Sequence, residues 1–174
     1  DIVIVSDYDK GTLNERAVKI VKSQFGNSKL FADVKPENRS WFTSFYCIAP
    51  NYGEAVKMAK ANNVSGLCHR IKKKLDLECI IVTLSENGLF VLDEQGKTCQ
   101  LDAHVCRTLP ERHHRIDVTG AGDTLLAVFA LFRTSGVSTL NAVKAANAAA
   151  GIVVNKLGTS VCGIEELRLE VAGE

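Results

Sequence analysis

Residues 117–124, with the sequence Asp-Val-Thr-Gly-Ala-Gly-Asp-Thr, lead into an apolar stretch that reaches about Arg133. The apolar stretch predicts a helix, and the small residues before it let the backbone approach a ligand closely. The first amides of a helix have no internal acceptor, and the helix macrodipole adds partial positive charge there. The stretch therefore predicts an anion site, suited to a phosphate, at the start of this helix.

An acid directly follows this glycine loop, because Asp123 comes after Gly120, Ala121 and Gly122. Its charge would repel a phosphate held by the loop, so two interpretations stand. In the first, Asp123 is a first-turn acid that complements the helix dipole. In the second, a phosphoryl group is transferred at the loop, where amides stabilise its charge and Asp123 takes the proton of the attacking hydroxyl.

Two other glycine-rich phosphate sites are excluded. A dinucleotide fingerprint needs a third glycine at position 125, where the chain has Leu125, so an oxidoreductase with a dinucleotide cofactor is disfavoured. A Walker loop needs Lys and Ser or Thr after its last glycine. Gly158 and Gly163 have the spacing, but Ile164 and Glu165 follow them.

Around the glycine loop, strand and helix patterns alternate along the chain. Short β-branched or apolar runs predict strands over 1–6 (buried), 29–34, 46–49, 79–84, 88–92 and 98–101. Helical spacing predicts helices over 13–25, 52–61, 66–75, 123–133, 138–155 and 163–171, with Asn14 or Thr12 as the first cap and Asn62-Asn63 closing the second helix. Residues 36–40 and 102–115 are expected to be loops. This alternation predicts an α/β fold with a mostly parallel sheet.

The composition is that of an ordinary globular protein. Of the 174 residues, 46% are hydrophobic and 24% charged, and the formal net charge is +1, which argues against a nucleic-acid partner. No apolar run reaches the roughly 18 residues of a membrane span, and we expect no signal peptide. The six cysteines form no Cys-x-x-Cys pair, so we expect free thiols in the cytoplasm rather than a zinc site. The pair His113-His114 is expected to lie in a solvated loop.

Three segments, in the expected order, resemble the ribokinase-like (PfkB) carbohydrate kinases. Residues 117–124 resemble the second signature of that family, although Val128 stands where the general pattern has alanine or glycine. Asn51-Tyr52-Gly53-Glu54 resembles its Asn-x-x-Glu motif, and residues 83–88 resemble its nucleotide loop after a strand.

Within this family, residues 6–11, 33–35 and 147–151 are similar to the heptose 7-phosphate kinase domain of bifunctional ADP-heptose synthases. The resemblance covers nearly the whole chain and implies a ribokinase-like, Rossmann-like three-layer fold. It implies further that residues 1–174 are the C-terminal, nucleotide-binding portion of a sugar kinase domain whose N-terminal half is absent.

The resemblance also implies roles for individual residues. Asp123 would be the catalytic base, and the amides of Gly120, Ala121 and Gly122 would form the anion hole. Asn51 and Glu54 would position Mg²⁺, often through water. Asp117 and Thr119 would bind K⁺ together with backbone around Val153, Lys156, Gly158 and Cys162. The nucleotide contacts would be Asn51, Tyr52, Gly53, Glu54, Thr83, Ser85, Gly88 and Asn147, the last near the adenine or ribose.

Structural alternatives stay open for several of these residues. Asn51 and Glu54, just after Pro50, also suit helix capping. Asn147 is equally a polar residue on an alanine-rich helix, and residues 83–88 are equally a strand and turn. Lys35 is either a phosphate contact or a solvated lysine, and Asp7 is a weaker candidate for facing the sugar.

The implied activity is ATP-dependent phosphorylation of a sugar or sugar-phosphate hydroxyl. Its expected acceptor is D-glycero-D-manno-heptose 7-phosphate, which becomes the 1,7-bisphosphate, with ATP and Mg²⁺ and possible K⁺. The alternatives are another ribokinase-like sugar or nucleoside kinase and a non-catalytic nucleotide-binding fragment. Without the acceptor half we expect weak or no activity, and exposed sheet edges favour a homo-oligomer.

Overall fold

The computed structural model describes residues 1–106 and 117–172, so His113-His114 and most of the expected loop 102–115 lie outside the described residues. The chain divides into two compact units. Unit 1 comprises Asp1–Ser85 and Leu89–Gln100, and unit 2 comprises Glu86–Gly88 and Leu101–Glu174. Each unit is described by itself below.

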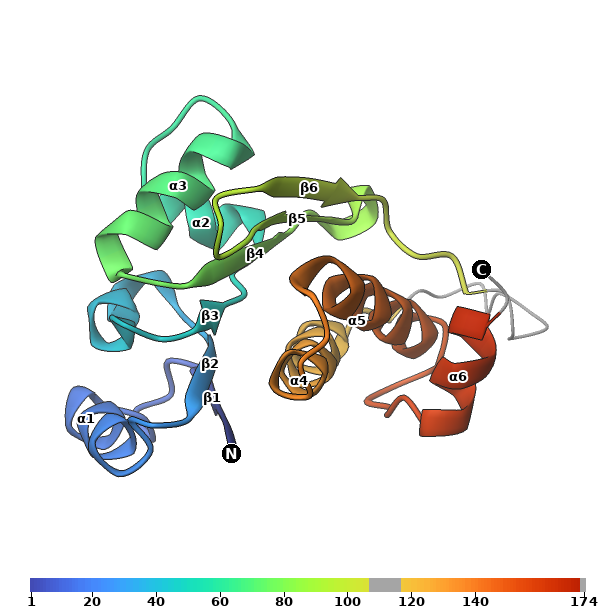
Figure 1. Ribbon diagram of the computed structural model, residues 1–174, viewed down its shortest axis with the longest axis horizontal. Helices are drawn as coiled ribbons and strands as arrows, with labels where there is room; N and C mark the ends of the chain where they lie inside the picture. The colour runs from blue at the N-terminus through green and yellow to red at the C-terminus, as the bar shows by residue number, and fades with distance from the viewer. Residues whose placement is uncertain (107–116, 173–174) are drawn as a thin grey trace. The chain divides into compact units, whose positions relative to one another are not determined.

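A six-stranded sheet, with its strands in sequence order, organises unit 1 (Figure 1). The strands are β1 (Ile2–Ser6), β2 (Lys29–Asp33), β3 (Cys47–Ile48), β4 (Cys79–Thr83), β5 (Leu89–Leu92) and β6 (Thr98–Leu101). The first four strands pair in parallel, whereas β5 runs antiparallel to β4. The predicted mostly parallel sheet is confirmed, because helices connect the parallel strands and a hairpin turn at Asp93–Gly96 connects β5 to β6.

Each α-helix of unit 1 is capped at its start by an asparagine. The helices are α1 (Glu15–Gln24), α2 (Tyr52–Met58) and α3 (Val64–Leu75), and the side chains of Asn14, Asn51 and Asn63 accept a backbone N–H of the first turn. These caps satisfy amides that have no partner inside the helix. The sequence prediction that Asn62-Asn63 closes α2 is wrong in part, because α2 ends at Met58 and Asn63 starts α3.

The core of unit 1 lies between one face of the sheet and its helices, and Figure 1 shows α1, α2 and α3 on the same side of the strands. Alternate strand residues point to this face, including Leu30, Ala32, Ile48, Ile80, Val82, Phe90 and Leu92. They pack against Val18 of α1, Met58 of α2 and Ile71 of α3. This packing fixes the carboxyl ends of the strands, where the candidate residues of unit 1 follow.

Two sequence expectations for unit 1 are wrong. Strand β1 is not buried, since Ile2 and Ile4 are 38% and 40% exposed, because β1 stands at the end of the sheet and pairs only with β2. Residues 36–40 are not a loop, because a 3-10 helix, η1, runs over Pro36–Phe42. Proline suits the first position of a helix, and the fully buried Phe42 anchors the end of this one.

Unit 2 is built mainly from the helices α4 (Ala121–Thr134), α5 (Thr139–Val154) and α6 (Ile164–Ala172). Helix α5 packs against both α4 and α6. Ser138 caps α5 as predicted, and Ala149, Ile152 and Leu167 form the centre of an apolar cluster between α5 and α6. In the part of the chain that the structure describes, no helix has the length and apolar character to cross a membrane.

Candidate active site

The glycine loop forms the start of α4 in unit 2. The helix begins at Ala121 rather than at Asp123 as predicted, with Gly120 as its cap at φ 80° and ψ −2°. Gly120 provides no side-chain cap, unlike the asparagines that begin α1, α2 and α3. The Ala121 N–H donates to Val118 O at 3.2 Å, and by helix geometry the Gly122 amide has no acceptor within the helix. The Gly122 amide is therefore an uncapped donor of the kind that an anion site requires.

Open space lies over the loop. A Cβ atom at Gly120 or at Gly122 would meet no atom within 4 Å. Gly120 needs glycine for its positive φ, but Gly122 has neither a positive φ nor a close neighbour that demands glycine. Because glycine within a helix costs roughly 0.5–1 kcal/mol relative to alanine, packing of the chain alone does not explain Gly122. The space suits a ligand that approaches the backbone.

Asp123 lies in the first turn of α4, as the third residue of the helix, and is exposed. This position places a carboxylate at the positive end of the helix dipole, as the first interpretation requires. It also places the same carboxylate beside the uncapped amide of Gly122, as the second requires. The choice between these interpretations rests on the chemistry proposed below.

Asp117 joins the glycine loop to the loop between α5 and α6. Its Oδ1 accepts the Thr119 N–H at 3.0 Å, and its Oδ2 accepts the Gly158 N–H at 3.1 Å. Hydrogen bonds from the Thr119 hydroxyl, from the Thr119 backbone N–H and from the Gly158 N–H hold the pKa of Asp117 below its usual value. Asp117 is therefore an ionised tether between the two loops.

Asp117 and Thr119 stay a predicted K⁺ site. The ionised carboxylate is a suitable hard ligand, but a cation there would share both of its oxygens with backbone N–H groups. The neighbouring loop already contains an ammonium group, because Lys156 Nζ donates to Val161 O at 2.8 Å and pairs with Glu166 at 2.7 Å.

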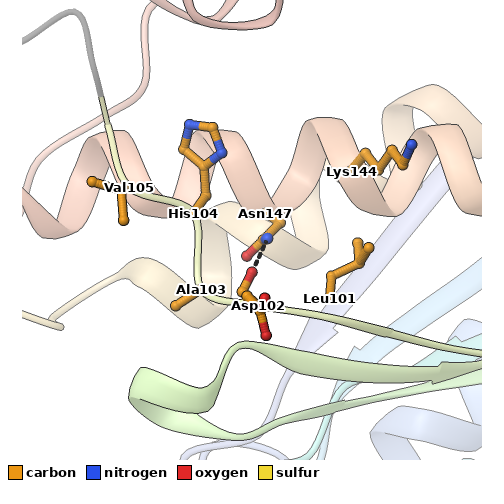
Figure 2. A pocket seen from close by; sticks show the side chains of 7 residues that line it. All are labelled: Leu101, Asp102, Ala103, His104, Val105, Lys144 and Asn147. Atoms are coloured by element: carbon orange, nitrogen blue, oxygen red, sulfur yellow. Dashed lines mark hydrogen bonds between the residues drawn. The ribbon is translucent and has the colours of Figure 1, made fainter. Parts of the chain in front are cut away.

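A pocket of about 420 Å³ lies between the segment after β6 and helix α5, entirely within unit 2 (Figure 2). It is lined by Leu101, Asp102, Ala103, His104, Val105, Lys144 and Asn147. Asn147 donates from Nδ2 to Asp102 O at 2.8 Å and so connects the two walls. The volume falls within the range of small-molecule sites. The candidate adenine or ribose contact, Asn147, thus lies in a pocket wall.

Gly88 lies directly against the backbone of the segment that forms one wall of this pocket. It has φ +80°, and a Cβ atom there would lie 2.0 Å from Leu101 O and 2.6 Å from Ala103 N. The loop before β5 therefore packs its backbone directly on the pocket wall. Thr83 ends β4, and Ser85 starts the short 3-10 helix η2 (Ser85–Asn87) that leads to Gly88.

In unit 1, Asn51 and Glu54 form a reciprocal capping box at the start of α2. Asn51 Oδ1 accepts the Glu54 N–H at 2.9 Å, and Glu54 Oε2 accepts the Asn51 N–H at 2.9 Å. The other oxygen, Glu54 Oε1, lies 2.6 Å from Lys35 Nζ. The capping alternative is thus present in the structure. Tyr52 and Gly53, in the same first turn, are exposed, and Asn51 also bridges to Thr83.

These contacts decide how Mg²⁺ would fit. Both Glu54 oxygens already accept hydrogen bonds, and the described residues contain no group of three His, Cys, Asp or Glu side chains that could hold a metal ion. Mg²⁺ usually keeps several waters and binds substrate phosphates, so Glu54 fits it through a metal-bound water.

Lys35, the partner of Glu54, carries a positive charge. Partial burial lowers the pKa of Lys35, but its hydrogen bond with Glu54 and the nearby Asp33, Glu54 and Asp7 carboxylates give a net rise, so Lys35 stays charged.

Asp7, the weaker sugar candidate, is only 1% exposed at the carboxyl end of β1. Its Oδ1 accepts the Asp9 N–H at 2.9 Å, and its Oδ2 accepts Asn38 Nδ2 at 3.0 Å. Asp7 therefore orders the turn after β1 and the start of η1.

Comparison with protein families matches residues 6–167 to the description "pfkB family carbohydrate kinase". The match includes every candidate residue in both units. The chain belongs to the pfkB family of carbohydrate kinases.

Two relatives of this pfkB-family chain cover nearly all of it. A D-beta-D-heptose 7-phosphate kinase from Bordetella bronchiseptica is 37% identical over 172 residues, covering 96% of this chain and 52% of the relative. A bifunctional protein HldE from Shewanella piezotolerans is 34% identical, covering 96% of this chain and 34% of the relative. The chain thus spans about half or less of the length of these relatives.

Solved structures share the ribokinase-like fold. Phosphofructokinase-2 from Escherichia coli, in complex with potassium, matches 99% of this chain and 56% of its own with a TM-score of 0.79 and 16% identity. Ribokinase from Thermotoga maritima matches 99% of this chain and 57% of its own, with a TM-score of 0.77 and 19% identity. At this identity the likeness establishes the fold alone.

The sequence did not indicate every residue of the unit 2 pocket in this pfkB-family chain. His104 and Lys144 line the pocket, but neither belongs to a motif. Lys144 lies one helical turn before Asn147 on α5, which places both residues on the same face of the helix. That spacing from Asn147 was the sequence signal that could have indicated Lys144. His104 lies in an irregular segment with no periodic pattern, so no comparable signal marks it.

Proposed function

We propose that this chain is the nucleotide-binding part of a sugar kinase that transfers the γ-phosphoryl group of ATP to a heptose 7-phosphate. The start of α4 carries the proposal, because it combines the uncapped amide of Gly122, open space over Gly122 and an acid, Asp123, as the third helical residue. The 37% identity to a protein named D-beta-D-heptose 7-phosphate kinase supports the choice of acceptor.

In this proposal, the nucleoside and the γ-phosphoryl group of ATP bind to different parts of unit 2. The pocket between residues 101–105 and α5 takes the base and ribose, with Lys144 and Asn147 on its helical wall. The amides of Gly120, Ala121 and Gly122 take the γ-phosphoryl group, and the Ala121 N–H exchanges its 3.2 Å hydrogen bond to Val118 O for one to the phosphate. In unit 1, the proposed nucleotide contacts are Thr83, Ser85, Asn51 and Glu54, with Tyr52 and Gly53 in the same turn as Asn51 and Glu54.

The chemistry assigned to the chain is positioning, charge stabilisation and proton removal. Asp123 accepts the proton of the anomeric hydroxyl as that oxygen bonds to the γ-phosphorus, and the bond from this phosphorus to the bridging oxygen breaks to release ADP. The glycine-loop amides stabilise the charge on the transferring group, an effect worth on the order of 3 kcal/mol for one such donor. When bound with ATP, Mg²⁺ would neutralise part of the phosphate charge.

The experiment is transfer of label from γ-labelled ATP to three acceptors in the presence of Mg²⁺. We expect heptose 7-phosphate to be labelled faster than fructose 6-phosphate or ribose. We also expect turnover below about 1 s⁻¹, the lower end of typical kinase rates, because the chain spans about half of the Bordetella relative. Faster labelling of fructose 6-phosphate or ribose than of heptose 7-phosphate would contradict the proposed acceptor.

A further inference from the structure

One wall of the unit 2 pocket is a segment without regular secondary structure. Residues 102–106 follow β6 and form neither helix nor strand, yet Asp102, Ala103, His104 and Val105 line the pocket. An irregular segment has no ladder of backbone hydrogen bonds to fix it, so other contacts must set its position. The fit of a ligand in the pocket depends on those contacts.

Helix α5 holds this wall at two points. Asn147 donates to the carbonyl oxygen of Asp102 at 2.8 Å, as Figure 2 shows. One turn further along α5, a Cβ atom at Gly151 would lie 2.7 Å from His104 O and 3.1 Å from His104 Cδ2. His104 therefore packs against the bare backbone of α5, which only a glycine permits at this distance.

The third contact comes from helix α6, outside the pocket. Glu170 Oε1 lies 2.8 Å from His104 Nε2, and Glu170 Oε2 accepts a hydrogen bond from Cys106 Sγ at 3.5 Å. The Glu170 side chain is 0% exposed and that of His104 is 11% exposed. A buried carboxylate is costly unless it is hydrogen-bonded, and both oxygens of Glu170 contact the 104–106 segment.

We propose that Glu170 is a positioning residue for nucleotide binding: through His104 it holds the 101–105 wall against α5 and so sets the affinity of the pocket. This inference rests on the proposed function, because it takes the pocket to be the site for the base and ribose. It assigns to the C-terminal helix a role in nucleotide affinity that does not require contact with the nucleotide.

The role predicts which kinetic constant changes. The wall belongs to the base pocket, whereas the transferring group is assigned to the start of α4. Loss of Glu170 therefore weakens ATP binding and raises the KM for ATP, with little change in kcat. If Glu170 served only the stability of α6, its loss would lower the fraction of folded chain without raising the KM for ATP of the chains that stay folded.

The test is a double-mutant cycle on this chain, with ATP affinity measured by calorimetry and folding checked by thermal unfolding. We expect Glu170→Ala to raise the Kd for ATP about tenfold, because a buried hydrogen-bonding partner is lost, and Glu170→Gln to have a smaller effect, because it retains the shape. In the His104→Ala background, Glu170→Ala should have a much smaller effect, since only its hydrogen bond from Cys106 is left to lose. Glu165→Ala is the control, because Glu165 lies on the same helix with its side chain 73% exposed.

Hydrogen exchange gives a second readout that needs no ligand. Amides of residues 101–106 should exchange faster in Glu170→Ala than in the parent chain, while those of α4 should not change. An unchanged Kd together with unchanged exchange would overturn the inference, as would full additivity with His104→Ala. If exchange is faster in Glu170→Ala but the parent chain does not bind ATP, the proposed function is overturned and only the positioning of the wall by Glu170 remains.

Discussion

Replacing Asp123 with asparagine is expected to lower sugar-phosphate formation about 100-fold or more, the range found when a general base is removed. Asparagine has nearly the same shape, but it cannot accept the hydroxyl proton. The affinity for ATP should stay within about twofold, because the amides of the glycine loop are retained and the repulsion between carboxylate and phosphate is removed. Label transfer and calorimetry on the same samples provide the two measurements.

Glu15 provides a matched control, because it is a first-turn acid of α1 that belongs to no candidate site. Glu15→Gln should cost only a few tenths of a kcal/mol of stability through the helix dipole and leave transfer unchanged. If Asp123→Asn has an equally small effect, Asp123 only complements its helix, and the first of the two interpretations is correct.

Replacing Gly88 with alanine is expected to destabilise the chain by about 3 kcal/mol. The left-handed backbone at φ +80° costs a side-chain-bearing residue roughly 1–2 kcal/mol, and overpacking adds about as much again. The atoms that the new Cβ would meet are Leu101 O at 2.0 Å and Asp102 C at 2.5 Å, which are backbone and cannot rotate away. Urea unfolding measures the loss.

Gly96 separates the two causes of that loss. It has nearly the same φ, +82°, but a Cβ atom there would meet nothing within 4 Å. Gly96→Ala should therefore lose only the backbone cost, about 1 kcal/mol. Gly88→Ala should in addition weaken ATP binding, because it displaces the pocket wall at residues 101–103. Equal losses of stability in the two variants would show that Gly88 makes no close contact with this wall.

Features with a local cause could be predicted from the sequence. Ser138 marks a helix start through its own side-chain chemistry, and Asn51 with Glu54 three residues later suits a capping box. The strand pattern likewise predicted the parallel sheet, because strands separated by helices pair in parallel.

Features that depend on distant partners could not be predicted. Burial of β1 was overestimated, because the sequence of a strand does not reveal that it stands at the end of the sheet. His104 and Glu170 are far apart in the chain and share no pattern, although they meet at 2.8 Å. Gly88 was expected to allow a turn, but its close approach to Leu101 O depends on how β5 and β6 bring two loops together.

The most direct measurement is an NMR titration that follows the backbone amides as Mg²⁺-ATP or adenosine is added. With ATP, the amide signals of Gly120, Ala121 and Gly122 should shift together with those of residues 103–105. With adenosine, only the pocket signals should shift, because no phosphate is present to bind the start of α4. If ATP binds and leaves the three glycine-loop amides unchanged, the phosphate site proposed at α4 is wrong.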